Sequence, residues 1–179
     1  SSPTESGKDC HRVKFVWDGN GTNFAHAIVK NAIKTSGKNW VLLTNDYVWG
    51  HNTAKATRSL VEAYGGKIVD ELMIPQNTRD FSAYLLKLQQ IKPQVVATAV
   101  GGDDIKALRQ QVVQVGLQKR MAWVNNEQDW PDVYGLGPEQ IQVKRVGKAL
   151  HVAFKGSVLA APDLVLEDFF KGKDEDRTR

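Results

Sequence analysis

The sequence predicts an α/β fold in which a parallel sheet is flanked by helices on both faces. Apolar runs of strand length begin near Trp40, Ile68, Val95 and Met121. Each of the first three runs is followed by a segment whose apolar residues recur at helical spacing. Because parallel neighbouring strands need a crossover connection, this regular alternation of strand and helix predicts a parallel sheet.

The segment ahead of this pattern contains a polar lead, a short strand candidate and a helix. Residues 1–12 are polar, and Val13–Trp17 is the strand candidate. After a run of turn residues, Thr22 is expected to be the N-cap of the helix, which Gly37 ends. One face of this helix carries apolar residues at helical spacing: Phe24, Ala25, Ile28, Val29, Ala32 and Ile33.

The first strand of the repeating pattern is Trp40–Thr44, a continuous apolar run of the kind found in sheets that are covered on both faces. The next helix is predicted at roughly residues 52–64, where a Gly-Gly pair closes it. Its buried face is expected to contain Ala56, Leu60, Ala63 and Tyr64. Lys67–Ile74 is the second strand, and Pro75 ends it.

A third helix and a third strand follow the polar loop at residues 76–79. Asp80 is a good N-cap, and Lys92 ends the helix because the residue before a proline disfavours helical backbone angles. The helix is expected to turn inward Phe81, Tyr84, Leu85, Leu88 and Ile91. Gln94–Val100 is the third strand.

The last regular helix is predicted after a Gly-Gly-Asp-Asp turn. Either Asp103 or Asp104 caps it, and Gly116 closes it. Its inward residues are expected to be Ile105, Leu108, Val112 and Val115. Met121–Val124 is the fourth strand.

Beyond Asp129 the regular pattern ends. A loop rich in turn residues is followed by Ile141–Val146, a further strand candidate, and by residues 150–166, which show no clean period. The tail at residues 171–179 is almost entirely charged, a composition typical of frayed or disordered segments.

Composition limits the classes of protein to which the chain can belong. A chain of 179 residues holds one ordinary domain, or one domain and a fragment. No apolar run approaches the roughly 20 residues that span a bilayer, and the N-terminus has no signal-peptide core, so the chain is expected to be cytosolic, or mature or truncated. The net charge is +4, but the basic residues are scattered over polar helix faces, which argues against nucleic-acid binding. Cys10 is the only cysteine, which excludes an internal disulfide.

Residues suited to ligand recognition follow two of the predicted strands, and ligands of such sheets gather at the carboxyl ends of strands. Tyr47 and Trp49 follow the first strand, where an aromatic ring covers an apolar or cationic ligand or packs against a neighbouring loop. Gly101, Gly102 and Asp103 follow the third strand. There the glycines let a ligand approach the backbone and the carboxylate faces an ammonium group, or the segment is a tight turn with helix caps.

The fourth strand is followed by a loop of amides and carboxylates that includes Asn126 and Asp129. This loop belongs either to the same ligand-facing edge of the sheet or to an ordinary polar connection. Together with the aromatic pair and the glycine-acid turn, it predicts one wall of a ligand cleft.

Signatures of catalysis and of cofactor binding are missing from the sequence. The four histidines are far apart and match no metal-ligand spacing. The chain has no Gly-x-Ser-x-Gly elbow and no phosphate-binding fingerprint, and no nucleophile stands beside an activating base. The sequence therefore favours binding over catalysis and predicts neither an enzyme nor a cofactor nor a metal. A nucleotide-dependent enzyme on a doubly wound sheet is the disfavoured alternative.

Several stretches, in the right order, resemble one family. Lys38–His51, with the core Trp-Val-Leu-Leu-Thr-Asn-Asp-Tyr-Val-Trp-Gly, resembles the start of the second lobe in type I periplasmic solute-binding proteins. The most similar branch contains the branched-chain amino acid and amide-type binding components of ABC importers. Further stretches resemble the same branch: residues 10–15, 75–82, 99–103, 115–117 and 123–135. Together they cover roughly residues 8–140.

The resemblance implies a Rossmann-like second lobe at residues 19–142. Residues 1–18 are then a lead and a remnant of the first lobe and crossover, and residues 143–179 are a C-terminal segment of undetermined role. In this family two similar lobes close on a solute like a trap. The resemblance therefore also implies that the first lobe and the signal peptide lie outside this chain, which is then a partial binding protein.

The resemblance implies the function of a non-catalytic substrate-binding component of an ABC importer for amino acids or amide-like solutes. Its partners would be the solute and a membrane permease, and its location periplasmic or otherwise outside the cytoplasm. A ligand-sensing domain of a regulator or receptor is the alternative. The implied solute contacts are Tyr47, Trp49, Gly101, Gly102, Asp103 and Asn126. An aromatic group at Trp49 would lie against the solute, and Asp103, or as second choice Asp129, would pair with its ammonium group.

Overall fold

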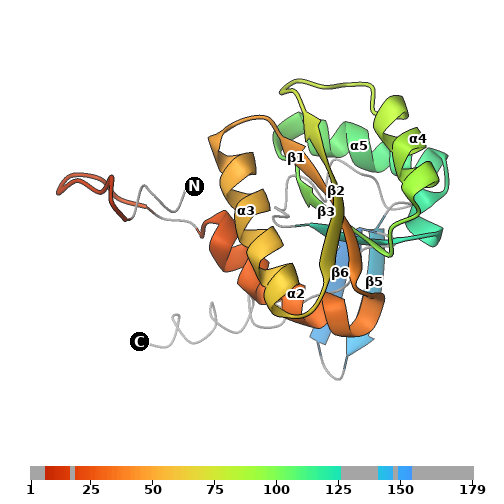
Figure 1. Ribbon diagram of the computed structural model, residues 1–179, viewed down its shortest axis with the longest axis horizontal. Helices are drawn as coiled ribbons and strands as arrows, with labels where there is room; N and C mark the ends of the chain where they lie inside the picture. The colour runs from red at the N-terminus through yellow and green to blue at the C-terminus, as the bar shows by residue number, and fades with distance from the viewer. Residues whose placement is uncertain (1–6, 17–18, 126–140, 147–148, 155–179) are drawn as a thin grey trace, which may run out of the picture.

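The computed structural model describes residues 7–16, 19–125, 141–146 and 149–154 (Figure 1). Four parallel strands form a sheet in the order β2-β1-β3-β4. These strands are β1 (Asn39–Asn45), β2 (Lys67–Ile74), β3 (Val95–Ala99) and β4 (Ala122–Asn125). The helices are α2 (Gly21–Ser36), α3 (Val48–Ala63), α4 (Ser82–Ile91) and α5 (Gly102–Gln114), with a short 3-10 turn, η1 (Leu117–Lys119), before β4.

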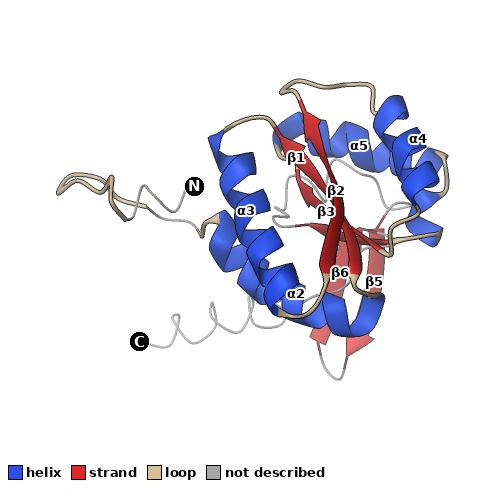
Figure 2. Ribbon diagram, in the orientation of Figure 1, coloured by secondary structure: helices blue, strands red, loops and turns tan. Residues whose placement is uncertain are grey.

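Two apolar cores lie on opposite faces of the sheet, because successive side chains of a strand point to opposite sides. In β1, Trp40 and Leu42 pack with residues of α2 and α3, while Val41 and Leu43 pack with residues of α4 and α5. All four side chains are at most 1% exposed. Figure 2 shows α2 and α3 on one side of the sheet and α4 and α5 on the other. The predicted fold class, a parallel sheet with helices on both faces, is confirmed.

Helix α2 begins one residue before the predicted cap. Asn20, not Thr22, is the N-cap, and its side-chain oxygen accepts the N–H groups of Thr22 (3.0 Å) and Asn23 (3.2 Å). The side chain of Asn23 in turn accepts the N–H of Asn20 at 3.2 Å, which completes a capping box. The predicted apolar face is buried except for Phe24, which is half-buried.

Helix α3 differs most from its prediction. It begins at Val48, before the expected start near residue 52, and the expected inward residues Ala63 and Tyr64 are exposed. The fully buried face instead includes two threonines, Thr53 and Thr57, and the Thr57 hydroxyl donates to the Thr53 carbonyl at 2.8 Å. A threonine whose hydroxyl bonds to its own helix can pack as an apolar residue does. A prediction that counts only hydrophobic residues therefore places the buried face of α3 part of a turn away from its true position.

The caps of α4 and α5 agree with the prediction in part. The N-cap of α4 is Phe81, one residue after the predicted Asp80, although the Asp80 carboxylate accepts the N–H of Ser82 at 2.9 Å. Lys92 ends that helix in the left-handed conformation, as expected. Gly101, however, is the N-cap of α5, and both Asp103 and Asp104 lie in its first turn. The prediction that one of these acids is the cap is wrong, because the backbone becomes helical before it reaches them.

Two further differences concern the ends of the chain. Residues 13–16 of the strand candidate Val13–Trp17 form no strand; Val13 is 84% exposed, and Figure 1 shows residues 7–16 projecting away from the sheet. The strand candidate Ile141–Val146 is confirmed as β5, which pairs antiparallel with β6 (Ala149–Phe154). The division into segments 1–18, 19–142 and 143–179 remains a prediction.

Candidate functional site

A polar cavity of about 280 Å³ lies at the carboxyl ends of β1, β2 and β3, the edge of the sheet at which ligands of such folds gather. We call this edge the strand-end rim. Four segments line its cavity: the ends of β1 and β3, the loop after β2, and the first turn of α5. The lining residues are Asn45, Tyr47, Gln76, Asn77, Arg79, Gly101, Gly102, Asp103 and Asp104.

The side chain of Asn45 joins the strand ends that form the rim. It is 1% exposed, and its amide nitrogen lies 3.4 Å from the Ile74 carbonyl at the end of β2. The side-chain oxygen accepts the N–H of Gly101, after β3, at 3.0 Å. One buried amide therefore fixes the ends of three adjacent strands relative to one another.

Asp104 has a structural role at the base of the cavity. It is 7% exposed, and its Oδ2 atom accepts the N–H of Asn77 at 3.0 Å and lies 3.4 Å from the Asn45 amide nitrogen. Asn77 has a φ of 65°, a left-handed conformation that asparagine tolerates. Because Asp104 is occupied by these bonds, its neighbour Asp103 is the acid that remains available to a ligand.

Asp103 is exposed at the mouth of the cavity between two basic side chains. Its side chain is 67% exposed, and its oxygens lie 3.2 Å from Lys106 Nζ and 3.9 Å from an Arg79 nitrogen. The sequence placed Asp103 at this edge, but it gave no role to Arg79. A signal was present: Arg79 follows β2, which ends at the same edge as β1 in a parallel sheet.

The aromatic pair occupies the β1 side of the rim. The rings of Tyr47 and Trp49 are stacked, with centroids 5.8 Å apart and an angle of 25° between their planes. Tyr47 lines the cavity, whereas Trp49 is 9% exposed and is not among the lining residues. A methyl group added at Gly101 would lie 3.8 Å from both side chains. Trp49 therefore supports Tyr47 from behind, and its direct contact with a solute stays a prediction.

The two predicted glycines lie where a ligand can approach the backbone. Gly101 and Gly102 both line the cavity, and Gly102 has a φ of 60°, which favours glycine. No atom lies within 4 Å of the position that a Gly102 side chain would occupy. Asn126 and Asp129 lie outside the described residues. Their neighbour Asn125 accepts the Thr98 hydroxyl at 2.7 Å, between the ends of β4 and β3.

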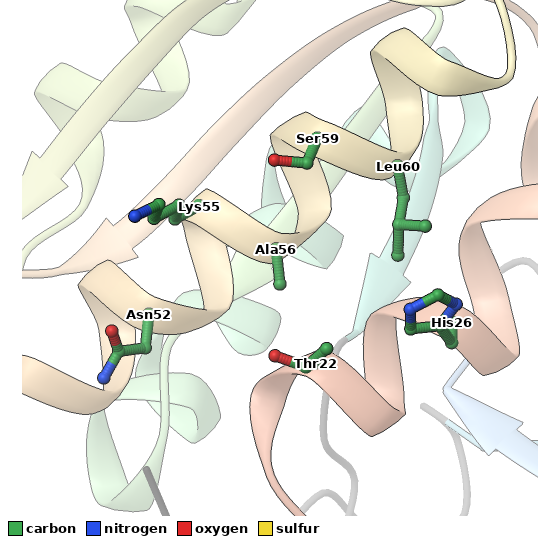
Figure 3. A pocket seen from close by; sticks show the side chains of 7 residues that line it. All are labelled: Thr22, His26, Asn52, Lys55, Ala56, Ser59 and Leu60. Carbon is green, nitrogen blue, oxygen red and sulfur yellow. The ribbon is translucent and has the colours of Figure 1, made fainter. Parts of the chain in front are cut away.

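A larger cavity, of about 380 Å³, lies between α2 and α3 (Figure 3). Thr22 and His26 face it from α2, and Ala56 and Leu60 face it from α3. Polar residues of α3, Asn52, Lys55 and Ser59, also line it, but carbon atoms form most of its exposed wall. Two helices alone form this groove, away from the strand ends. We assign the candidate site to the smaller, polar rim cavity, because position at the strand ends and convergent polar groups indicate a ligand site better than volume does.

The described residues contain no group of three His, Cys, Asp or Glu side chains that could hold a metal ion. His51 pairs with Asp46 at 2.9 Å, and both side chains are more than half exposed. None of the described helices is long and apolar enough to cross a membrane.

Comparison with known proteins identifies the family. Residues 1–150 match the family model described as periplasmic binding protein. The chain belongs to this family. The match confirms the predicted resemblance and the prediction of a non-catalytic protein, because the family consists of binding proteins. No curated protein sequence matches the chain.

Solved structures of periplasmic binding proteins share the fold. One from Burkholderia mallei is 29% identical, with a TM-score of 0.72, over 79% of this chain and 38% of its own. A branched-chain amino acid ABC transporter ligand-binding protein from Burkholderia xenovorans is 26% identical, with a TM-score of 0.67, over 75% and 36%. A solute-binding protein of Rhodopseudomonas palustris in complex with 4-hydroxybenzoate is 21% identical, with a TM-score of 0.60, over 68% and 33%. The chain thus spans little more than a third of the length of these relatives.

Proposed function

We propose that this chain is a ligand-binding lobe of the substrate-binding component of an ABC importer for amino acids or amide-like solutes. It acts without catalysis, outside the cytoplasm, and hands its solute to a membrane permease. The observation that carries the proposal is the polar cavity at the strand-end rim, where an exposed carboxylate, an aromatic ring and two glycines converge. Residues 19–142 form the lobe in this proposal.

The rim offers complementary groups for such a solute. Asp103, with its exposed carboxylate, pairs with an ammonium or amide N–H group, and Tyr47 covers the apolar part of the solute. The glycines leave room for the solute to approach the first turn of α5. Trp49 supports Tyr47, and Asn126 and Asp129 are further solute contacts in this proposal.

The charges at the rim favour an amino acid over an aromatic acid as the solute. The relative from Rhodopseudomonas palustris holds 4-hydroxybenzoate, which carries a carboxylate and no ammonium group. In this chain the carboxylate of such a solute would meet Arg79 and Lys106, but the solute would bring no positive charge to Asp103, which lies between these two cations. An amino acid brings a positive charge for Asp103. The name of the Burkholderia xenovorans relative includes branched-chain amino acids, which carry this charge.

Isothermal titration calorimetry with a panel of L-amino acids, their amides, urea and 4-hydroxybenzoate tests the proposal. We expect binding of one or more amino acids or amides with a Kd in the millimolar range, because closure of a second lobe around the solute supplies much of the affinity in this kind of protein. Asp103→Asn should weaken that binding about fivefold, whereas Glu62→Gln, which removes the same charge from the exposed end of α3, should leave it unchanged. A folded protein that binds none of the panel, or 4-hydroxybenzoate alone, would overturn the proposal.

A further inference from the structure

Arg79 and Asp103 form an unusually open ion pair inside the candidate site. Both side chains line the same cavity, and they are 60% and 67% exposed. The closest nitrogen and oxygen are 3.9 Å apart, too far for a hydrogen bond. Asp103 Oδ1 accepts from Lys106 Nζ at 3.2 Å, whereas Oδ2 faces Arg79, so this oxygen and the guanidinium keep positions for a third partner. Exposed pairs of this kind contribute little to stability, and stability therefore does not explain the juxtaposition.

The backbone that carries Arg79 is held firmly against α5. The Gln111 side chain, on α5, donates from Nε2 to the Arg79 carbonyl at 2.7 Å and accepts the N–H of Phe81 through Oε1 at 2.8 Å. Phe81 itself is fully buried. Because Asp103 lies in the first turn of the same helix, Gln111 places the two charges on one unit.

We infer that Arg79 is a specificity-determining residue that recognises a carboxylate of the solute, while Asp103 recognises its cationic nitrogen. The inference rests on the proposed function and deepens it. In an α-amino acid, the ammonium nitrogen and the nearer carboxylate oxygen are roughly 3 Å apart, because both groups are attached to one carbon through bonds of about 1.5 Å. This spacing is close to the 3.9 Å between Arg79 and Asp103. The solute then lies antiparallel to the ion pair, with its ammonium group against Asp103 and its carboxylate against Arg79.

Two classes of solute are selected against by this arrangement. An amide has no anion for the Arg79 guanidinium, which prefers to bind a carboxylate through two parallel N–H groups. An ω-amino acid has both charges, but at opposite ends of a chain that is longer than the ion pair. The lobe described here therefore recognises both ends of an α-zwitterion by itself and does not leave the carboxylate to an opposing lobe.

This inference can be tested by monitoring the NMR signals of the Gly101 and Gly102 amides while the full chain is titrated with three matched solutes. These are L-leucine, L-leucinamide, which lacks the anion, and 6-aminohexanoate, an isomer of leucine with its charges at opposite ends. We expect leucine to bind roughly threefold to tenfold more tightly than either of the others. Arg79→Gln should reduce leucine to the affinity of leucinamide and should leave leucinamide within twofold of its original Kd.

Two variants serve as controls for Arg79→Gln. Arg79→Lys keeps the charge and should retain part of the preference for leucine. Arg120→Gln removes an exposed arginine just ahead of β4, at the opposite edge of the sheet, and should retain all of it.

Four outcomes would overturn the inference, and the last would overturn the proposed function with it. Equal binding of leucine and leucinamide, with both weakened by Asp103→Asn, would do so and leave the proposed function standing. Equal weakening of leucine and leucinamide by Arg79→Gln would reduce Arg79 to a structural residue. If leucine, leucinamide and 6-aminohexanoate all fail to bind while another amide or urea binds, Arg79 has no carboxylate to recognise. If no solute of the whole panel binds, the proposed function is wrong as well.

Discussion

Asn45 and Asp104 show how buried polar residues shape the candidate site. Both are buried at the base of the cavity, and each bonds to backbone that belongs to another segment of the rim. A buried polar group left without partners costs about 1–3 kcal/mol, so these bonds hold the rim in one arrangement before any solute arrives. Such preorganisation is what allows the exposed side chains of Tyr47, Arg79 and Asp103 to be presented together.

The burial of Trp49 leads to a prediction that differs from what its position in the sequence suggests. The sequence left Trp49 either to cover a ligand or to pack against a neighbouring loop, and the family resemblance implied contact with the solute. In the structure Trp49 is 9% exposed and stacks on Tyr47, which favours packing. Trp49→Ala should therefore lower the free energy of unfolding by about 3 kcal/mol, as measured by urea denaturation, because truncating a buried aromatic ring removes apolar contacts and leaves a cavity. Trp49→Phe keeps a ring and should lose less than half as much. A loss below about 1 kcal/mol for the alanine variant would contradict the packing role.

Gly50 and Gly101 provide a matched pair of substitutions. A methyl group at Gly50 would collide with the carbonyl oxygen of Asn45, which is backbone and cannot move aside, so Gly50→Ala should lower stability by at least about 2 kcal/mol. At Gly101 the same methyl group has room, and the φ of −122° suits any residue. Gly101→Ala exchanges one N-cap residue for another, so it should lower the free energy of unfolding by about 1 kcal/mol or less. It should nevertheless weaken solute binding, because the added methyl group narrows the cavity. Urea denaturation and calorimetry measure the two effects, and similar stability losses for both variants would refute this account.

At the scale of elements, the strands were the most predictable part of the fold. The continuous apolar runs of the central strands β1 and β3 are required by burial on both faces, and that requirement is visible in the residues themselves. The start of α3 was not predictable, because Val48-Trp49-Gly50 has little intrinsic preference for a helix. Its helical conformation depends on the close approach of Gly50 to the end of β1, a tertiary contact.

The candidate site was predictable to a similar extent. Tyr47, Gly101, Gly102 and Asp103 followed from strand ends, and all four line the cavity. Arg79 was missed although its loop follows β2 at the same edge of the sheet, because the sequence does not reveal that β2 lies directly beside β1, which brings this loop to the cavity. The sequence does indicate which acid of α5 is buried. Asp104 lies on the same helix face as buried Ile105 and Leu108, whereas Asp103 does not.

The ion pair between Asp70 of β2 and Lys87 of α4 leads to a prediction about how stability depends on pH. The hydrogen bond from Lys87 at 2.9 Å holds the pKa of Asp70 below its ordinary value of 3.8. The unfolded chain therefore binds a proton more readily than the folded one, so the contribution of this pair is complete above pH 3.8 and disappears as the pH falls through the lower pKa of the folded state. Urea denaturation of the wild type and Asp70→Asn should show a stability difference at pH 6 that shrinks at pH 3. A difference that stays constant or grows on acidification would exclude the pair as its source.

At the scale of the whole molecule, the described residues present an open polar cavity at one edge of the sheet. The exposed charges of the rim have neighbours within their own lobe, yet they remain more than half accessible, and the cavity that they line is open and polar. Binding energy in such a cavity comes from a few charged and aromatic contacts rather than from enclosure. Under the proposed function, the cavity is thus expected to bind its solute weakly but with the same preferences that a closed cleft would show.

The central claim is that the strand-end rim, and not the larger groove between α2 and α3, is the recognition surface. The most direct test is to map the backbone amide shifts of ¹⁵N-labelled protein during titration with L-leucine. The account predicts that the largest shifts occur at Gly101, Gly102 and Asp103, and that Thr22, His26 and Lys55, which line the groove, stay unchanged. Shifts that cluster at the groove and spare the rim would contradict it.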